Sequence, residues 1–344
     1  MNPVLITKLN NAFTLFLSLL VEAIPFLILG VLLSSLLLLF VDEKKLIASL
    51  PKNPLLGALF GSCAGFLFPV CECGNVPVAR RLLMQGAPAP VAIGFLLAAP
   101  TINPIVIWST WIAFREQPEI VFLRVGFSLA IATSIAYLFS FQADMKPLLQ
   151  SAITRGAFLP IEDEKNQTST PSLLKSGSYI LGGGITQRLD PSILGNTSPS
   201  PASVDKVSIQ QKLSLFIENS VQELRELGGV LVLGSMVAAI LQVAVPREVI
   251  VSLGQGPILS IVAMMILAAL VSICSTVDAF FALAFASTFT GGSLLAFLVF
   301  GPMVDLKALG LMLTVFKPRA IIYIFAIAAQ LTFLFTLFMN LYIS

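Results

Sequence analysis

Thiols, a carboxylate and an amide lie together in one short apolar stretch of the chain. Residues 69–77 read Pro-Val-Cys-Glu-Cys-Gly-Asn-Val-Pro, so Cys71 and Cys73 flank Glu72, and Asn75 follows. Soft thiolate ligands select soft ions such as Cu(I), Zn(II) or trivalent arsenic. The pattern therefore indicates a substrate-binding site for a soft solute, although no metal ligand set is certain.

The spacing of the two thiols sets a condition on the backbone. On a continuous helix, side chains two positions apart point about 200° apart. Cys71 and Cys73 can therefore face one site only if the helix is unwound there. The helix-breaking residues Pro69, Gly74 and Pro77 favour such a break.

The two other cysteines lie in apolar segments, as these do, so a structural disulfide framework is not expected. Buried cysteine often acts as a small hydrophobic residue. We expect this packing role for Cys63, which has Gly61 and Gly65 beside it. For Cys274, packing and substrate binding are both open.

Acids and amides also occur inside apolar segments. An acid within a membrane costs several kcal/mol unless it is paired, so it marks a candidate functional site. Asp278 and Asp305 are the candidates for proton or cation coupling, and Asn103 is a candidate substrate contact. Asp305 could instead cap a broken helix, because aspartate is a favoured N-cap.

Two adjacent arginines follow the first thiol stretch. Arg80 and Arg81 could pair with Glu72 or Asp278, but long basic side chains also reach toward the membrane surface. We favour this second interpretation for the arginine pair.

Composition assigns the class of protein that must position these groups. Hydrophobic residues make up 57% of the 344 residues and charged residues only 11%, against about 25% charged in an average soluble domain. The mean hydropathy is +0.94. These values predict an all-α polytopic membrane protein. A net charge of +2 and the absence of histidine give no basis for a nucleic acid partner or for a histidine metal site.

Hydropathy divides the chain into two transmembrane halves. We expect a first repeat over residues 1–141, a polar and mostly disordered linker over 142–212, and a second repeat over 213–344. The segments 76–86 and 303–316 are too short to span a bilayer, so we expect discontinuous or re-entrant helices there, within eight to ten spans overall. Counts of four or five crossings per half leave parallel and inverted repeats open.

The two halves match each other at polar positions as well as apolar ones. Glu22 recurs as Glu226, which indicates a structural role at the start of each half. The repeat also pairs Asn75 with Asp278. Residues of the first half match residues 202 to 204 positions later in the second half: 22–30 match 226–234, Cys71 matches Cys274, and 95–103 match 297–305. Internal repeats with broken helices are typical of secondary transporters.

Three motifs resemble the ArsP/YraQ-type permeases: Cys-Glu-Cys-Gly-Asn-Val-Pro at 71–77, Phe-Leu-Leu-Ala-Ala-Pro-Thr-Ile-Asn-Pro at 95–104, and Phe-Gly-Pro-Met-Val-Asp-Leu-Lys at 300–307. The resemblance covers nearly the whole chain outside 142–212. It implies a multi-pass permease of the bacterial inner (plasma) membrane. Characterised members of that family export trivalent organoarsenicals, while most relatives have no assigned substrate.

The sequence thus predicts a permease that exports a soft metalloid or thiol-reactive compound by ion-coupled alternating access. The alternatives are an uptake permease or channel for a metal ion or sulfur compound, and a membrane subunit of a multi-component permease. No nucleophile–base pair or phosphate-binding loop is present, so no enzyme activity and no cofactor are expected. The expected partners are the lipid bilayer, the solute, and an accessory membrane subunit or a second copy of the chain.

Overall fold

The computed structural model describes residues 3–40, 50–51, 53–68, 71–141, 149–150, 209–244 and 256–342. Regular secondary structure in these residues is helical, apart from one isolated antiparallel bridge between Leu149 and Phe316. The expected all-α class is therefore confirmed. The expected linker lies mostly outside the described residues, although α9 begins within it, at Ile209.

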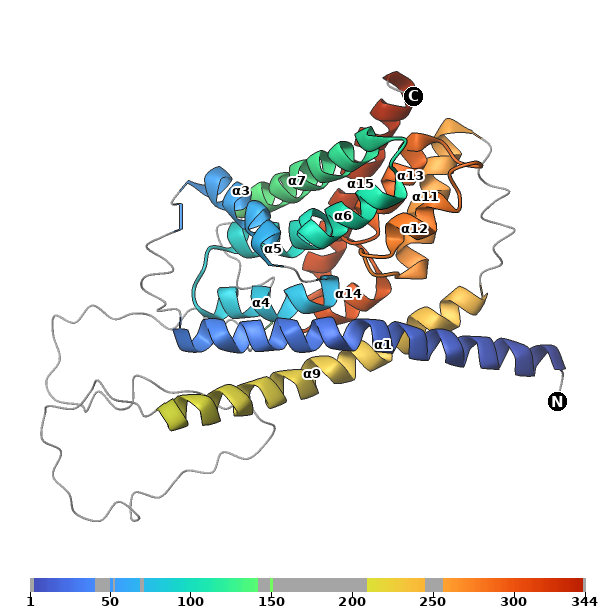
Figure 1. Cartoon of the computed structure of the whole chain (residues 1–344). Coiled ribbons are helices and arrows are strands. Elements are labelled where there is room, and N and C mark those ends of the chain that lie inside the picture. The colour runs from blue at the N-terminus through green and yellow to red at the C-terminus, as the bar shows by residue number, and fades with distance from the viewer. Residues whose placement is uncertain are drawn as a thin grey trace, which may run out of the picture.

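Two long helices lie side by side along one face of the molecule: α1 (Pro3–Phe40) and α9 (Ile209–Ala244) (Figure 1). Ser34, near the end of α1, donates a hydrogen bond to Glu223, near the start of α9 (2.9 Å). Leu19, nearer the start of α1, packs against Ala238 near the end of α9. The two helices are therefore antiparallel.

The other helices form a body above this pair (Figure 1). In the first half they are α3 (Pro54–Ala64), the 3-10 helix η1 (Gly65–Leu67), α4 (Glu72–Met84), α5 (Ala89–Ile102), α6 (Pro104–Ala113) and α7 (Pro118–Ser140). In the second half they are α11 (Pro257–Val271), α12 (Asp278–Leu283), α13 (Gly291–Phe300), α14 (Leu306–Met312) and α15 (Pro318–Tyr342).

Contacts between the halves involve the short helices as well as the long ones. Helix α4 packs against α14, α6 packs against α12, and α7 packs against α13 and α15. Each half begins with its longest helix, α1 or α9, and ends with a helix of more than 20 residues, α7 (23 residues) or α15 (25 residues). The internal repeat itself stays a prediction.

Proline and a capping side chain break the chain at matching places. Asn103 accepts a hydrogen bond from the N–H of Ile105 (2.9 Å) and separates α5 from α6. Asp305 accepts one from the N–H of Ala308 (2.6 Å) and begins α14. Pro104 stands at the first position of α6, where its missing N–H leaves no bond unmade.

Five helices among the described residues are long and apolar enough to cross a membrane: Ile6–Leu37, Ala89–Ala113, Pro118–Ser140, Phe216–Val243 and Pro318–Tyr342. The chain is thus a multi-pass membrane protein. The sequence predicts eight to ten spans, more than these five. The difference arises because several apolar segments fold as helices that are shorter than a span. Those helices are Pro54–Leu67, Pro257–Val271 and Gly291–Phe300.

Small residues let α3 and α5 approach closely. A Cβ placed on Gly61 would meet the Cα of Val91 at 2.7 Å, and one on Gly65 would contact Ala99. Cys63 lies between these glycines but is exposed on the surface of α3. The expectation that Cys63 packs in the interior is therefore wrong, because the glycines on either side face α5 and Cys63 does not.

We predict that Gly61→Ala lowers the thermal unfolding midpoint of the purified protein in detergent micelles. The added Cβ overpacks the α3–α5 contact, at a cost of about 1–3 kcal/mol. The matched control is Gly126→Ala on α7, where a new Cβ meets nothing within 4 Å and alanine favours the helix. Equal shifts for the two variants would contradict close α3–α5 packing.

Candidate functional site

The first part of the site lies where helix α4 begins. Cys71 is the N-cap residue, with extended backbone (φ −84°, ψ −177°), and Glu72 and Cys73 occupy the first helical turn. The first N–H groups of a helix have no partner within it and favour negative charge. The backbone therefore presents both thiols at an electropositive helix end.

The location of this break differs from the expectation. Gly74 and Pro77 lie inside α4, so they do not unwind it. The helix is interrupted before Cys71 instead, and Pro69 is outside the described residues. Pro77 is the sixth residue of α4, so its missing N–H leaves the carbonyl of Cys73 without its usual helical partner, yet the helix continues through it.

The second part of the site comes from the other half of the chain. Helix α11 ends at Val271, and Ser272 adopts a left-handed conformation (φ 47°) that turns the chain toward α12. Cys274 lies in this turn. The hydroxyl of Thr276 donates a hydrogen bond to its sulfur (3.5 Å).

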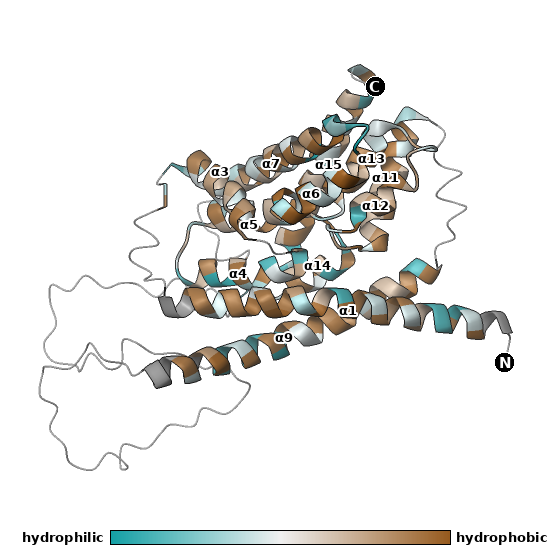
Figure 2. Cartoon of the chain, in the orientation of Figure 1, coloured by the Kyte–Doolittle hydropathy of each residue, from teal (hydrophilic) through white to brown (hydrophobic). Residues whose placement is uncertain are grey.

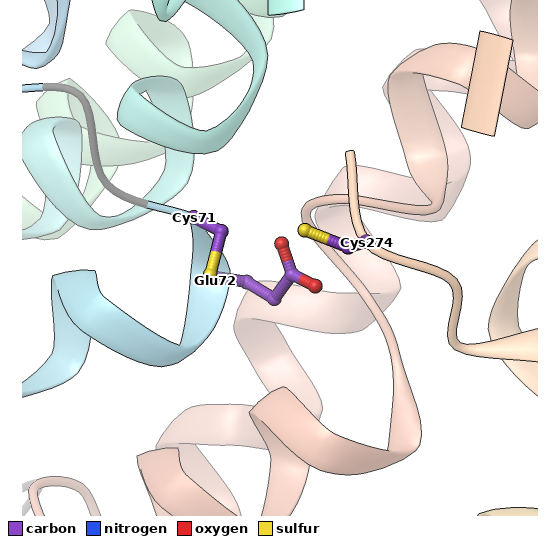
Figure 3. Close-up of side chains that lie close together, drawn as sticks. All are labelled: Cys71, Glu72 and Cys274. Atoms are coloured by element: carbon purple, nitrogen blue, oxygen red, sulfur yellow. The ribbon is translucent and has the colours of Figure 1, made fainter. Parts of the chain in front are cut away.

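Cys71, Glu72 and Cys274 meet at this junction (Figure 3). One sulfur or carboxylate oxygen from each of them lies within 4.8 Å of the other two, and all three side chains are buried. Cys73 is also buried, but it is not part of this group. Two soft donors and one hard donor from two separate segments thus converge on one point.

A buried lysine faces the same region. Lys307 of α14 is 1% exposed and interacts electrostatically with Glu72, Cys73 and Asp305. Glu22 of α1 also interacts with it. Sequence reasoning did not single out Lys307, although it stands two residues after Asp305 between apolar segments, which is a signal that could have found it. In Figure 2, hydrophilic residues occur on α4 and α14, the helices of the body that lie next to α1.

Several buried polar atoms near this junction have no hydrogen-bond partner from another described residue. They belong to Glu72 (both carboxylate oxygens), Asn75 (both amide atoms), Ser275 (the hydroxyl) and Asp305 (Oδ2). Leaving buried polar groups unpaired is costly, and such groups are usually satisfied by protein, water or a ligand. The junction therefore has the capacity to bind a polar solute.

The remaining predicted residues have structural partners. Asn103 and Asp305 are both buried and cap α6 and α14, so the capping expected for Asp305 occurs. Asp278 forms an ion pair with Arg124, which the sequence analysis did not single out. Neither Asn103 nor Asp278 belongs to the Cys71, Glu72 and Cys274 group.

The arginine pair and the recurring glutamates also differ from the expectations. Arg80 pairs with Glu226 of α9 (3.0 Å), so the expected partners Glu72 and Asp278 are wrong for Arg80. Its side chain is 17% exposed, so it does not extend freely to the surface. Of the glutamates that recur at the start of each half, Glu226 forms an ion pair with Arg80 of the opposite half, and Glu22 interacts only electrostatically with Lys307.

Comparison with known proteins agrees with this membrane architecture. A family model described as "Predicted permease" (ArsP_1) matches residues 8–341. The chain belongs to the ArsP_1 family. The family resemblance expected from the three motifs is thereby confirmed, and it favours a transporter over an enzyme.

Two curated relatives cover most of the chain. The UPF0718 protein YcgR of Bacillus subtilis (strain 168) is 38% identical over 306 residues, which is 89% of each chain. A putative two-component membrane permease complex subunit of Streptococcus mutans serotype c (strain ATCC 700610 / UA159) is 34% identical over 308 residues, 90% of this chain and 88% of that protein. No solved structure matches the chain.

We predict that the purified ArsP_1 protein binds Cd²⁺, used as a soft probe, through Cys71 and Cys274. Cys71→Ser and Cys274→Ser should each weaken binding on the order of tenfold to a hundredfold, because oxygen is a poor ligand for soft ions. The matched control is Cys63→Ser, whose thiol is exposed on α3 and away from the junction. Ultraviolet absorption of the cadmium–thiolate bonds during titration measures this, and equal binding by all three variants would exclude the site.

Proposed function

We propose that this ArsP_1 chain is a permease of the bacterial plasma membrane that exports a small soft solute, such as a trivalent metalloid or another thiol-reactive compound. The observation that supports this most is the convergence of Cys71, Glu72 and Cys274 within 4.8 Å of one another in a buried junction. A thiol pair supplied by two segments can hold a soft atom without any cofactor.

The two halves each supply one side of this site. Cys71 and Glu72 come from the start of α4, and Cys274 comes from the turn before α12. A small movement of one half against the other would therefore open the site toward one side of the membrane. Alternating access of this kind is typical of transporters with broken helices and internal repeats.

The antiparallel α1–α9 pair supports inverted rather than parallel repeats. These helices begin the two halves, and repeat-related helices run in opposite directions only when the repeats have opposite orientation in the membrane. Ser34 contacts Glu223 while Leu19 packs against Ala238, which fixes their opposite directions.

For coupling to an ion gradient, we propose Asp305 as the better of the two predicted acids. Its Oδ2 has no hydrogen-bond partner from another described residue, and Lys307 interacts with it electrostatically. Both oxygens of Asp278, in contrast, bond to Arg124. A buried carboxylate that has one oxygen without a hydrogen bond can take up and release a proton or another cation, while Lys307 offsets its charge in the unloaded state.

A second candidate function is that of one subunit in a larger permease, which would import or conduct a metal ion or a sulfur compound. The name of the Streptococcus mutans relative, a subunit of a two-component permease complex, supports this alternative. An accessory membrane subunit would then complete the pathway. Transport assayed with the purified chain alone in liposomes separates the two functions, because export by the chain alone requires no partner.

We predict that cells which lack their own exporters, and which express this ArsP_1 protein, accumulate less of a trivalent methylated arsenical than cells without it. Cys71→Ser and Cys274→Ser should each remove most of this difference, because the solute loses a sulfur ligand. Cys63→Ser should keep it. Accumulation per molecule of inserted protein is the measurement, and full export by the Cys71→Ser/Cys274→Ser double variant would exclude a thiol-based pathway.

We also predict that Lys307→Met strongly reduces either export or the amount of folded protein. It removes the buried cation that interacts electrostatically with the carboxylates of Glu72 and Asp305, and a buried charge without a compensating charge is costly. Lys307→Met/Asp305→Asn should recover part of the loss, because the second change removes one of the uncompensated charges. Lys317→Met is the matched control outside the cluster, and equal effects of Lys307→Met and Lys317→Met would contradict this electrostatic role of Lys307.

A further inference from the structure

A fully buried ion pair joins the two halves next to the solute site. Arg124 of α7 donates two hydrogen bonds to the carboxylate of Asp278, at 3.0 Å from Nη1 and 2.6 Å from Nη2. The side chains are 0% and 3% exposed. Arg124 also bonds the hydroxyl of Thr110 on α6 (2.7 Å), so three helices meet at this guanidinium.

Asp278 is linked directly to the turn that carries Cys274. The backbone N–H of Asp278 donates to the carbonyl oxygen of Cys274 (3.1 Å), and that of Val277 donates to the same oxygen (2.9 Å). Thr276, within this turn, donates to the sulfur. Fixing Asp278 therefore fixes the short segment from which the Cys274 thiol extends.

The opposite side of the solute site has a separate attachment. Cys71 and Glu72 stand at the start of α4, and a Cβ on Gly30 of α1 would meet the backbone of Gly74, one turn later. The first-half donors are thus fixed against α1, while Cys274 is held to the first half through Arg124. The distance between the sulfurs depends on both attachments.

We infer that Arg124 is a positioning residue which, through Asp278, holds the Cys274 thiol against Cys71 and Glu72. This inference rests on the proposed solute site. It gives Asp278 a role in geometry in place of the ion coupling expected from the sequence. The planar guanidinium is suited to this role because it binds both carboxylate oxygens in one orientation, which a lysine ammonium does not.

The test measures how readily Cys71 and Cys274 form a disulfide. In a variant that keeps only these two cysteines, a protease site is placed within residues 151–208, and the protein in membranes is oxidised with copper phenanthroline and oxygen. Each disulfide releases two protons and gives two electrons to oxygen through copper. After proteolysis, the halves stay joined on a non-reducing gel only if the disulfide has formed.

We expect the disulfide to form quickly in this two-cysteine protein. The rate of its formation should fall at least fivefold when Asp278→Asn or Arg124→Gln is added. Arg124→Lys should slow it less, because it retains the charge without the two-point geometry. The exchange Arg124→Asp/Asp278→Arg should recover part of the rate. Arg115→Gln, at an exposed arginine of the same half, is the matched control and should leave the rate unchanged.

The paired substitution Arg124→Met/Asp278→Leu keeps the test decisive if single variants fail to fold, because apolar replacement of a buried ion pair is often neutral for stability. We expect slow oxidation in this variant at normal abundance. An unchanged rate would overturn the inference while leaving the solute site intact. Failure of a trivalent arsenical to protect the two thiols, with the Arg124 dependence retained, would instead count against the proposed function alone.

Discussion

Buried charges in this protein must be paired by other parts of the chain, because the interior of a bilayer offers no water to do so. The clearest case is the ion pair of Arg124 with Asp278, which is fully enclosed and joins α7 to α12. A second ion pair, of Arg80 on α4 with Glu226 on α9, is only partly buried, because the two side chains are 17% and 42% exposed. Each of these contacts joins one half of the chain to the other. Because an unpaired buried charge is energetically unfavourable, these ion pairs stabilise the observed arrangement of the two halves.

The same constraint explains why the candidate site lies at the junction. Unpaired polar atoms of Glu72 and Asn75 would be costly in the middle of one apolar helix bundle. Between the halves, broken helices supply helix ends, a buried lysine (Lys307) and two thiols within one small volume. A solute that binds there can satisfy these atoms.

The two long helices, α1 and α9, each carry a glycine that packs closely and a glutamate that interacts with a cation. Gly30 of α1 lets the backbone of α4 approach closely. A Cβ placed on Gly234 of α9 would lie 3.5 Å from the Cα of Lys307. Eight residues before each glycine lies a glutamate that interacts with a cation of the opposite half: Glu226 pairs with Arg80, and Glu22 interacts electrostatically with Lys307. Each long helix therefore combines a close approach to its own half with an electrostatic interaction with the other.

The sequence by itself determined the membrane class, the family and the residue types of the site. Long apolar segments with few charges leave no other class, and the stretch from Cys71 to Pro77 already placed thiols, an acid and an amide together. The sequence also indicated that the helix must break close to these cysteines, because side chains two residues apart on a continuous helix point in different directions. Helix-breaking residues and composition are local properties, so a sequence can reveal them.

Only the tertiary structure decided which distant groups meet. Arg124 looks like any cation near a helix start until the fold places Asp278 of α12 beside it, and the sequence alone does not say which acid pairs with Arg80. The same holds for Cys63, whose neighbours suggested burial but whose side chain faces outward. Pairing across about 150 residues depends on how helices cross, and the energies of competing pairs differ too little for the sequence alone to select among them.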